Sequence, residues 1–194
     1  MQWLLWRAPS RSNDSMRVEI VLETHSTSVD NEAGIASGWR EVSLSPTGRR
    51  QAKELGERHR GERIDAVFPS DLRRAVKTAE IAFPGSSIPI YPDRRLRESD
   101  YGTMTGAPAF EIERERQNRV ELPFPEGESL LDVVARVRSF LDDLARDWDG
   151  KRVVRVGHRA TLLALEHLFG GVSLESAASA QFTWQPGWHY ALEV

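Results

Sequence analysis

The chain has 194 residues, of which 40% are hydrophobic and 28% charged, a size and composition that suit one globular α/β domain better than two. Its net charge of −3 and the lack of a Lys/Arg block exclude a surface built for nucleic acid. The absence of cysteine excludes disulfides, thiol nucleophiles and cysteine-ligated metal sites, and the apolar runs are too short to span a membrane. We therefore expect a cytoplasmic protein whose partner is a small molecule, with no nucleic acid and no membrane. The oligomeric state has no signature in the sequence.

The first fifteen residues differ from the rest of the chain. They lack the hydrophobic core and the cleavage site of a secretory signal. The first clear strand pattern begins directly after Met16. We interpret residues 1–15 as an N-terminal extension outside the natural chain and residues 16–194 as a single domain. The alternative is that apolar residues of the extension dock on the domain surface, namely Trp3, Leu4, Leu5 and Trp6.

Strand and helix patterns then alternate, which predicts a three-layer α/β/α sandwich with a mostly parallel central sheet. The strands expected are residues 17–23, 65–68, 88–91 and 152–156, with a hairpin or paired strand within 182–192. The helices expected are residues 45–59, a helix capped by Ser70, 110–119, a long helix capped by Ser129, and 160–169.

Polar residues follow the expected strands at one edge. In a parallel sheet the ligand lies beyond the carboxyl ends of the strands. His25 follows the first strand, Arg74 lies on the first helical turn after the second, Glu98 follows the third, and His158 follows the fourth. Two histidines, an arginine and a glutamate are therefore expected to meet at one edge of the sheet.

These residues stand in four motifs. His25 is followed at three and six positions by Ser28 and Asn31. The stretch Ser70-Asp71-Leu72-Arg73-Arg74-Ala75-Val76-Lys77-Thr78-Ala79 contains Arg74. Leu96-Arg97-Glu98 precedes Tyr101-Gly102, and Gly127-Glu128-Ser129 precedes His158. In this order and context the sequence resembles the histidine phosphatase superfamily, the phosphoglycerate mutase-like phosphatases.

The resemblance implies a metal-independent phosphomonoester hydrolase without a cofactor. A neutral imidazole can attack phosphorus through one nitrogen while the other is oriented by a hydrogen bond, which is the role implied for His25. Arg74 and a protonated His158 would stabilise the phosphoryl oxygens, with Ser28 and Asn31 as neutral donors. Glu98 would protonate the leaving oxygen and then deprotonate water.

Three positions depart from the family pattern. Thr24 stands where an arginine normally precedes the nucleophile, Ser26 replaces a glycine, and Arg159 replaces a small residue. The phosphate-binding site has thus lost a fixed positive charge, and we expect weakened turnover. Arg159 is either the replacement cation or a solvated surface residue, and the sequence favours neither.

Other functions compete with the hydrolase. A catalytically weakened or inactive phospho-ligand binder is the main alternative, although a mere binder has no use for Glu98. A phosphoglycerate mutase is disfavoured because the resemblance implies for true mutases a longer chain, with inserted segments that close the site against water. A metal-dependent hydrolase is disfavoured because the two histidines lack a third ligand at suitable spacing. Substrate specificity is expected to come from residues 103–125. Trp39, Trp184 and Trp188 either rim a pocket or pack in the interior, and packing is favoured. The remaining histidines are expected to be structural, namely His59, His167 and His189.

Overall fold

The computed structural model describes residues 4–7, 17–85 and 87–193. Its described residues form a sheet in the order β1-β5-β2-β4-β3. Strands β2, β4 and β3 are parallel, β5 runs antiparallel to β2, and β1 pairs parallel with β5. The strand bounds are β1 Leu4–Arg7, β2 Arg17–Thr24, β3 Ala66–Pro69, β4 Arg152–Gly157 and β5 Trp188–Glu193.

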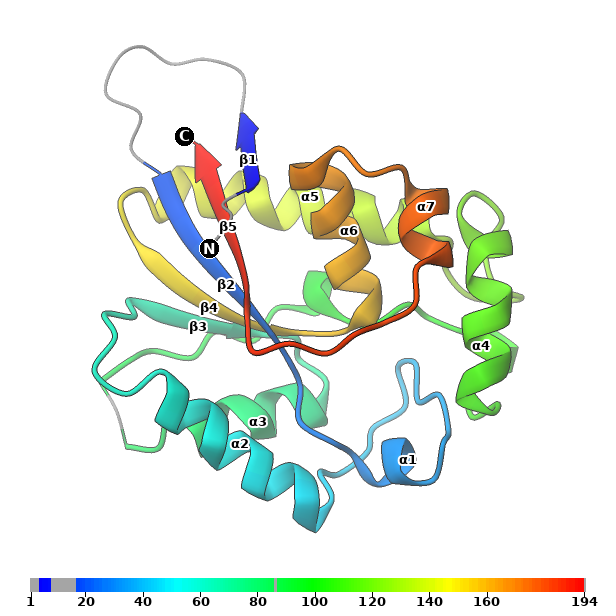
Figure 1. The fold of residues 1–194 in the computed structure, drawn as a ribbon, viewed down its shortest axis with the longest axis horizontal. Helices are drawn as coiled ribbons and strands as arrows, with labels where there is room; N and C mark the ends of the chain where they lie inside the picture. The colour runs from blue at the N-terminus through cyan, green and yellow to red at the C-terminus, as the bar shows by residue number, and fades with distance from the viewer. Residues whose placement is uncertain (1–3, 8–16, 86, 194) are drawn as a thin grey trace.

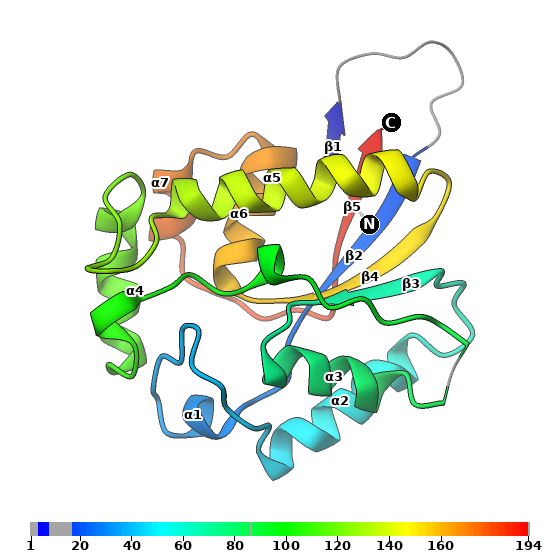
Figure 2. The ribbon, with the colours of Figure 1, turned by 180° about the vertical axis from the view of Figure 1, so that it is seen from behind.

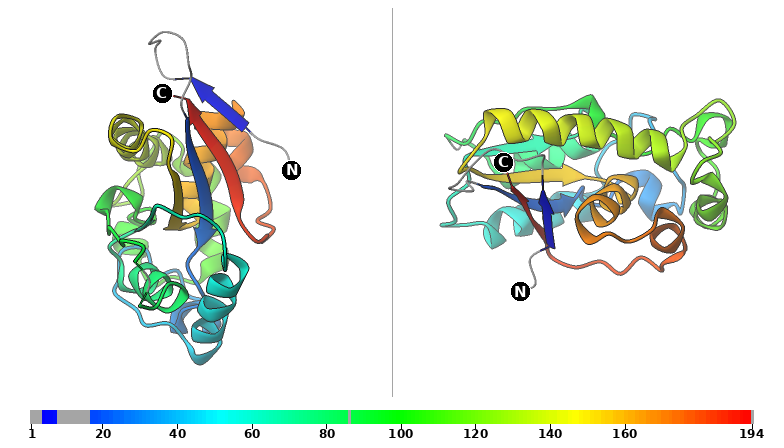
Figure 3. Two further views of the ribbon diagram at one scale, coloured as in Figure 1. Left: turned by 90° about the vertical axis from the view of Figure 1, so that its left-hand side faces the viewer. Right: turned by 90° about the horizontal axis from the view of Figure 1, so that it is seen from above.

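Helices cover both faces of this sheet, as Figures 1 and 2 show. One layer contains α2 (Pro46–Arg58) and α3 (Arg73–Ala82), and the other contains α5 (Leu130–Asp147), α6 (Arg159–Gly170) and α7 (Leu174–Ser179). Figure 3 shows α5 lying along the sheet. The expected three-layer α/β/α sandwich is confirmed. The short elements are α1 (Val29–Glu32), α4 (Ala109–Glu115) and 3-10 turns at Arg94–Leu96, Gly102–Met104 and Arg116–Arg119.

The side chains of β2 point alternately to the two faces of the sheet, and the core is accordingly divided into two halves. Ile20 and Leu22 are buried in the cluster beneath α5 and α6, whereas Val21 is buried in the cluster beneath α2 and α3. Successive side chains of a strand point to opposite faces, so both helical layers pack on this one strand. β2 lies between β5 and β4, and its carboxyl end carries His25.

Two of the expected helix starts are found as predicted. Ser45 caps α2 by accepting a hydrogen bond from Gly48 N at 3.0 Å, and Pro46 is the first helical residue. Ser129 forms a capping box with Asp132 at the start of α5. Both caps satisfy backbone donors that helix geometry leaves without partners.

Residues 88–91 were wrongly predicted as a strand. Ile90 forms only an isolated parallel bridge with Val67. Pro89 and Pro92 lack the N–H that a continuous ladder needs, so only Tyr91 of this segment donates to β3, at 2.9 Å to Val67 O. The segment follows the sheet edge without becoming a strand.

The two ends of the chain meet at the opposite edge. The tail was expected as a hairpin or a paired strand, and it forms β5, paired with β2. Within the extension, Leu4–Arg7 forms β1 in register with β5. Trp3 and Met16 lie outside the described residues, and a natural start at Met16 stays a prediction. Of the described helices, none is long and apolar enough to cross a membrane.

Candidate active site

His25 directly follows β2, and both nitrogen atoms of its ring are oriented by hydrogen bonds. Its backbone N donates to Gly157 O at 3.0 Å, which ties it to the end of β4. The ring Nδ1 lies 2.8 Å from Ser26 O, and because a carbonyl only accepts, Nδ1 carries the proton. Nε2 therefore has the lone pair, and Arg74 Nε donates to it at 3.3 Å. Burial and the Arg74 charge lower the pKa of His25 to about 3, so the ring is neutral at physiological pH.

His158 lies beside His25, with 4.9 Å between the ring centroids. Arg74 Nη2 lies 3.5 Å from Nδ1 of His158, and Ser70 Oγ lies 2.6 Å from its Nε2. Donation by Arg74 places the imidazole proton on Nε2, from which it points to Ser70 Oγ. Burial, then Arg74 and His25, lowers the pKa of His158 well below its usual value. The resting ring is neutral, in contrast to the protonated donor that the family roles suggest. Ser70, expected as a helix cap, holds His158 instead, and the N-cap of α3 is Leu72.

Arg74 is the cation that joins the two histidines. It is buried, and Nη2 and Nη1 donate to the carbonyl oxygens of Gly38 and Arg40 at 2.8 and 3.2 Å. The guanidinium thus supports both rings from behind while its fork faces the loop that contains Gly38. Each of its three nitrogen atoms donates to a protein group, and a role of Arg74 toward phosphoryl oxygens stays a prediction.

Glu98 is held by backbone donors from two segments. Its Oε1 accepts from Ser99 N at 2.9 Å and Ala160 N at 3.1 Å, and its Oε2 accepts from Arg159 N at 3.2 Å. The last two donors belong to the first turn of α6, where an anion is favoured by the helix dipole. The Glu98 carbonyl accepts from Trp39 Nε1 at 2.7 Å. The carboxyl group is therefore fixed near His158 before any substrate binds.

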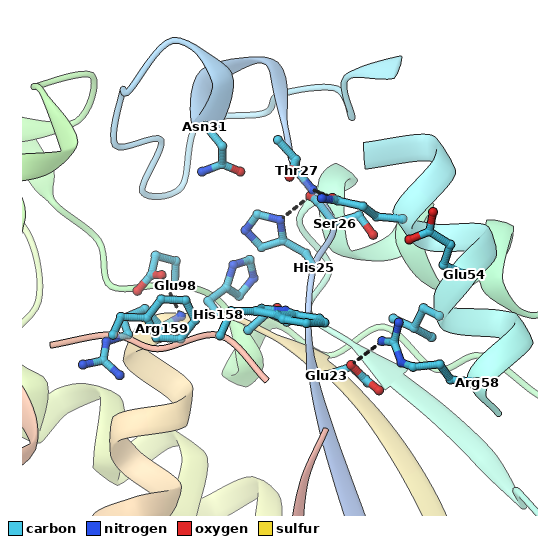
Figure 4. A pocket seen from close by; sticks show the side chains of 15 residues that line it. Glu23, His25, Ser26, Thr27, Asn31, Glu54, Arg58, Glu98, His158 and Arg159 are labelled. Atoms are coloured by element: carbon cyan, nitrogen blue, oxygen red, sulfur yellow. Dashed lines mark hydrogen bonds and ion pairs between the residues drawn. The ribbon is translucent and has the colours of Figure 1, made fainter. Parts of the chain in front are cut away.

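A pocket of about 600 Å³ lies over these groups. In Figure 4, Glu98 and Arg159 lie on one side of the two histidines, and Glu23 and Arg58 lie on the other. The lining includes the predicted residues Thr24, His25, Asn31, Glu98, His158 and Arg159. Its remaining residues are Glu23, Ser26, Thr27, Gln51, Glu54, Leu55, Arg58, Phe182 and Trp184.

Ser28 is not brought into this pocket. Its side chain is fully buried, and it caps α1 by accepting from Asn31 N at 3.1 Å while its hydroxyl donates to Asn31 Oδ1 at 2.9 Å. The neutral-donor role expected for Ser28 is thus replaced by a capping role, because the helix N-terminus competes for the same hydroxyl. Asn31 accepts through Oδ1 from Ser28 and itself lines the pocket.

Arg159 is held in place rather than extended into solvent. Its Nη2 donates to Ala180 O at 2.8 Å, and its Cζ lies 5.1 Å from the centroid of the Phe182 ring. Burial lowers the pKa of Arg159, although the group stays a cation at physiological pH. Of the two interpretations, the free surface residue is therefore wrong, and a role of Arg159 toward phosphate stays a prediction.

Several pocket residues were missed by sequence reasoning. Trp184 was expected to pack in the interior, yet 56% of it is exposed on the pocket wall. Arg58 was not considered, although Gln51, Glu54 and Arg58 recur at helical steps of three and four and so share one face of α2. This spacing on a helix that packs near β2 is a signal from which these three pocket residues could have been predicted.

The motifs support one another across the site. Asp71 of the second motif accepts two hydrogen bonds from Arg97 of the third, at 2.7 and 2.8 Å. Thr78 Oγ1 accepts from Ser26 N at 3.0 Å, which fixes the residue after His25. Gly102 has φ +51°, and a Cβ there would lie 2.0 Å from Pro125 O, so this turn requires glycine.

Comparison with known proteins agrees with this architecture. A family model described as histidine phosphatase superfamily (branch 1) matches residues 20–187, and the chain belongs to that superfamily. It is 31% identical to a putative phosphoserine phosphatase 2 of Hydrogenobacter thermophilus over 81% of each chain. It is 33% identical to a 2,3-bisphosphoglycerate-dependent phosphoglycerate mutase of Methylobacterium sp., over 81% of this chain and 83% of that one.

Solved structures show the same fold. Bacillus stearothermophilus YhfR superposes with a TM-score of 0.78 at 28% identity, covering 87% of this chain and 88% of that one. A mycobacterial glucosyl-3-phosphoglycerate phosphatase superposes with a TM-score of 0.71 at 25% identity, covering 86% and 88%. Phosphatases and mutases therefore both occur among the similar proteins.

Proposed function

We propose that this chain is a phosphomonoester hydrolase that acts on a small phosphorylated metabolite through a phospho-histidine at His25. The observation that carries the proposal is the state of the His25 ring. It is neutral, it is oriented through Nδ1, and its unprotonated Nε2 accepts only a long hydrogen bond of 3.3 Å from Arg74, at a pocket that also contains Glu98. A nucleophile prepared in this way needs no separate base to deprotonate it.

The proposed reaction has two balanced steps. In the first, His25 Nε2 forms a bond to phosphorus as the phosphorus–oxygen bond to the alcohol breaks, and Glu98 gives its proton to the leaving oxygen. In the second, water attacks phosphorus, Glu98 takes a proton from that water, and the phosphorus–nitrogen bond breaks to release phosphate. Arg74, which donates to the nucleophile, adds a positive charge that stabilises the negative phosphoryl oxygens, and the His158 ring lies beside the nucleophile.

Two alternatives share this site. A mutase would return the phosphoryl group to a second hydroxyl instead of water, and mutases are among the relatives. A non-catalytic binder would keep the pocket without turnover, since Thr24 leaves one cation fewer beside His25. The fixed carboxyl group of Glu98 supports a catalyst over a binder, because its backbone partners hold at the pocket a group that can exchange a proton with the leaving oxygen and with water.

The proposal is tested by release of inorganic phosphate from nitrophenyl phosphate and from phosphoserine, with and without chelator. We expect activity that survives chelator and is lost in His25→Ala. His167→Ala is the matched control, since His167 lies outside the pocket with Nδ1 at 2.8 Å from Val172 O. Activity that chelator abolishes, or that His25→Ala retains, would contradict the proposed enzyme class.

A further inference from the structure

The wall formed by the segment between α7 and β5 contains the two exposed aromatic side chains of the pocket, Phe182 and Trp184. We propose that the pocket selects phosphomonoesters whose alcohol carries a flat aromatic ring, and that this ring stacks on the Trp184 indole. The inference rests on the proposed function for the position of the phosphoryl group at His25.

The Trp184 ring is exposed but not loose. Arg58 Cζ lies 5.8 Å from the centroid of the indole, within the range of a cation–π contact. Arg58 Nη2 in turn donates to Glu23 Oε2 at 3.0 Å. The Glu23 carboxylate is buried, and its other oxygen lies 3.0 Å from His59 Nε2. A chain of contacts thus runs from the interior through Glu23 and Arg58 to the indole at the pocket.

Phe182 forms the part of this wall that lies next to Arg159. Its ring lies over the Arg159 guanidinium at 5.1 Å and stacks on Trp188 at 6.3 Å with 26° between the planes. Because its contacts are already made with protein groups, Phe182 contributes mainly to the shape of the segment. Trp184 is the more exposed ring, at 56% against 39%, and so offers the larger free surface to a ligand.

The chemistry of this wall suits a ring better than a sugar or an amino acid. Covering a large aromatic face that is otherwise exposed to water with a second flat ring is favourable, and such stacking tolerates many ring types. The hydrogen-bonding groups that a hydroxyl-rich alcohol needs, such as Asn31, Gln51 and Glu54, lie on other segments of the pocket, whereas the wall at 182–184 presents ring surfaces backed by guanidinium groups. The adjacent cations also strengthen the attraction for an electron-rich π system.

The test compares adenosine 5′-monophosphate with ribose 5-phosphate, which share the phosphoester and the leaving oxygen and differ by the ring. Dissociation constants are measured by calorimetry in a His25→Ala background, and turnover of both esters is measured in the parent. We expect the nucleotide to bind about 5- to 50-fold more tightly than the sugar phosphate. Trp184→Ala should bring this ratio close to one, Trp184→Phe should retain most of it, and Phe110→Ala, an exposed ring outside the pocket, should leave it unchanged.

Equal affinities for the two esters in the His25→Ala background would overturn the inference, and so would a preference that survives Trp184→Ala. Failure of the proposed function looks different. Ring preference without turnover in the parent would remove the hydrolase and keep the stacking site, whereas turnover of both esters at equal affinity would keep the hydrolase and remove the stacking site.

Discussion

At the scale of single residues, the two histidines are held neutral by the same surroundings that orient them. Burial and Arg74 disfavour a second positive charge at either ring, while Ser26 O and Ser70 Oγ fix the tautomers. His59 differs, because burial lowers its pKa but the carboxylates of Glu23 and Glu62 raise it above 6.5 overall. The pKa values of the two pocket histidines are therefore lowered, whereas that of His59, outside this pocket, is raised.

This contrast predicts a titration pattern. Because the pKa of His25 is about 3, its ring should not gain a proton between pH 8 and pH 5, and because the pKa of His158 is lowered, its ring should gain a proton only below pH 6.5. His59 should lose its proton only above pH 6.5. Nitrogen chemical shifts measured by NMR across this range would show both effects, and would also report whether Nδ1 of His25 carries its proton. Titration of His25 near pH 6.5 would contradict the described geometry.

The role of Glu98 predicts a dependence on the leaving group. Glu98→Gln retains an oxygen that can accept from Ser99 N and Ala160 N but removes the transferable proton. We expect kcat/KM for an alkyl phosphate to fall about 10²- to 10⁴-fold, with a much smaller loss for nitrophenyl phosphate, whose anion needs little protonation. Equal losses on both substrates would remove Glu98 as the acid.

Arg159 is the residue to test as the replacement for the cation that Thr24 lacks. It lines the pocket and is fixed by Ala180 O. We expect Arg159→Ala to raise the inhibition constant of inorganic phosphate about tenfold, which corresponds to the loss of one charge-assisted hydrogen bond, and Thr24→Arg to restore part of the affinity. Arg73→Ala is the control, since Arg73 is exposed outside the pocket. Parent-like affinity in both alanine variants would mean that the pocket works with one cation fewer.

The pocket residues could be predicted from the sequence where their place at the end of a strand determines that they lie at the carboxyl edge of the sheet. His25, Glu98 and His158 follow strands or the segment beside them, and all three line the pocket. Ser28 was misplaced because its hydroxyl is consumed by the cap of α1. For Trp184, interior packing was favoured over a place at the pocket rim, because its position beside Arg58, far away in the sequence, has no local pattern.

At the scale of elements, β4 carries a charge into the core. Arg155 is buried, its Cζ lies 6.0 Å from the Phe140 ring, and none of its three side-chain nitrogen atoms has a hydrogen-bond partner among the described residues. Burial lowers its pKa to about 9. A buried cation without hydrogen bonds costs free energy that an apolar side chain of similar length does not.

We therefore expect Arg155→Met to raise the free energy of unfolding by about 1–3 kcal/mol, measured by urea denaturation. Arg152→Met on the same strand is the control. Arg152 is partly exposed and pairs with Glu62 at 3.0 Å, so its replacement should change stability by less than about 1 kcal/mol. A clear loss of stability in Arg155→Met would show that the buried guanidinium is satisfied by groups other than the protein side chains around it.

The elements themselves followed from local patterns where those patterns were strong. Ser45-Pro46 and Ser129 marked helix starts because capping is a local interaction. Residues 88–91 have the apolar content of a strand, which is why a strand was predicted. Pro89 and the following Pro92 prevent a continuous ladder, and only an isolated bridge forms. Helix α7, Leu174–Ser179, was not expected, since six residues give too short a pattern to detect.

At the scale of the whole molecule, the sheet brings four distant segments to one pocket, and the C-terminal segment before β5 forms one of the pocket walls. β5 returns beside β2, so the segment that precedes it contributes Phe182 and Trp184 near the end of the strand that carries His25. The superfamily and its fold are established, while the acceptor of the phosphoryl group, water or a second alcohol, depends on what this wall admits. Both proposed routes would pass through the same phosphorylated histidine.

Trapping that intermediate tests the central claim most directly. Enzyme mixed with a phosphate-labelled monoester and quenched during turnover should retain label that is stable to alkali, is lost in acid, and maps to the peptide containing His25. His25→Ala should retain none, and His167→Ala should retain as much as the parent. Turnover by the parent without any trapped label, or label on another residue, would contradict the account.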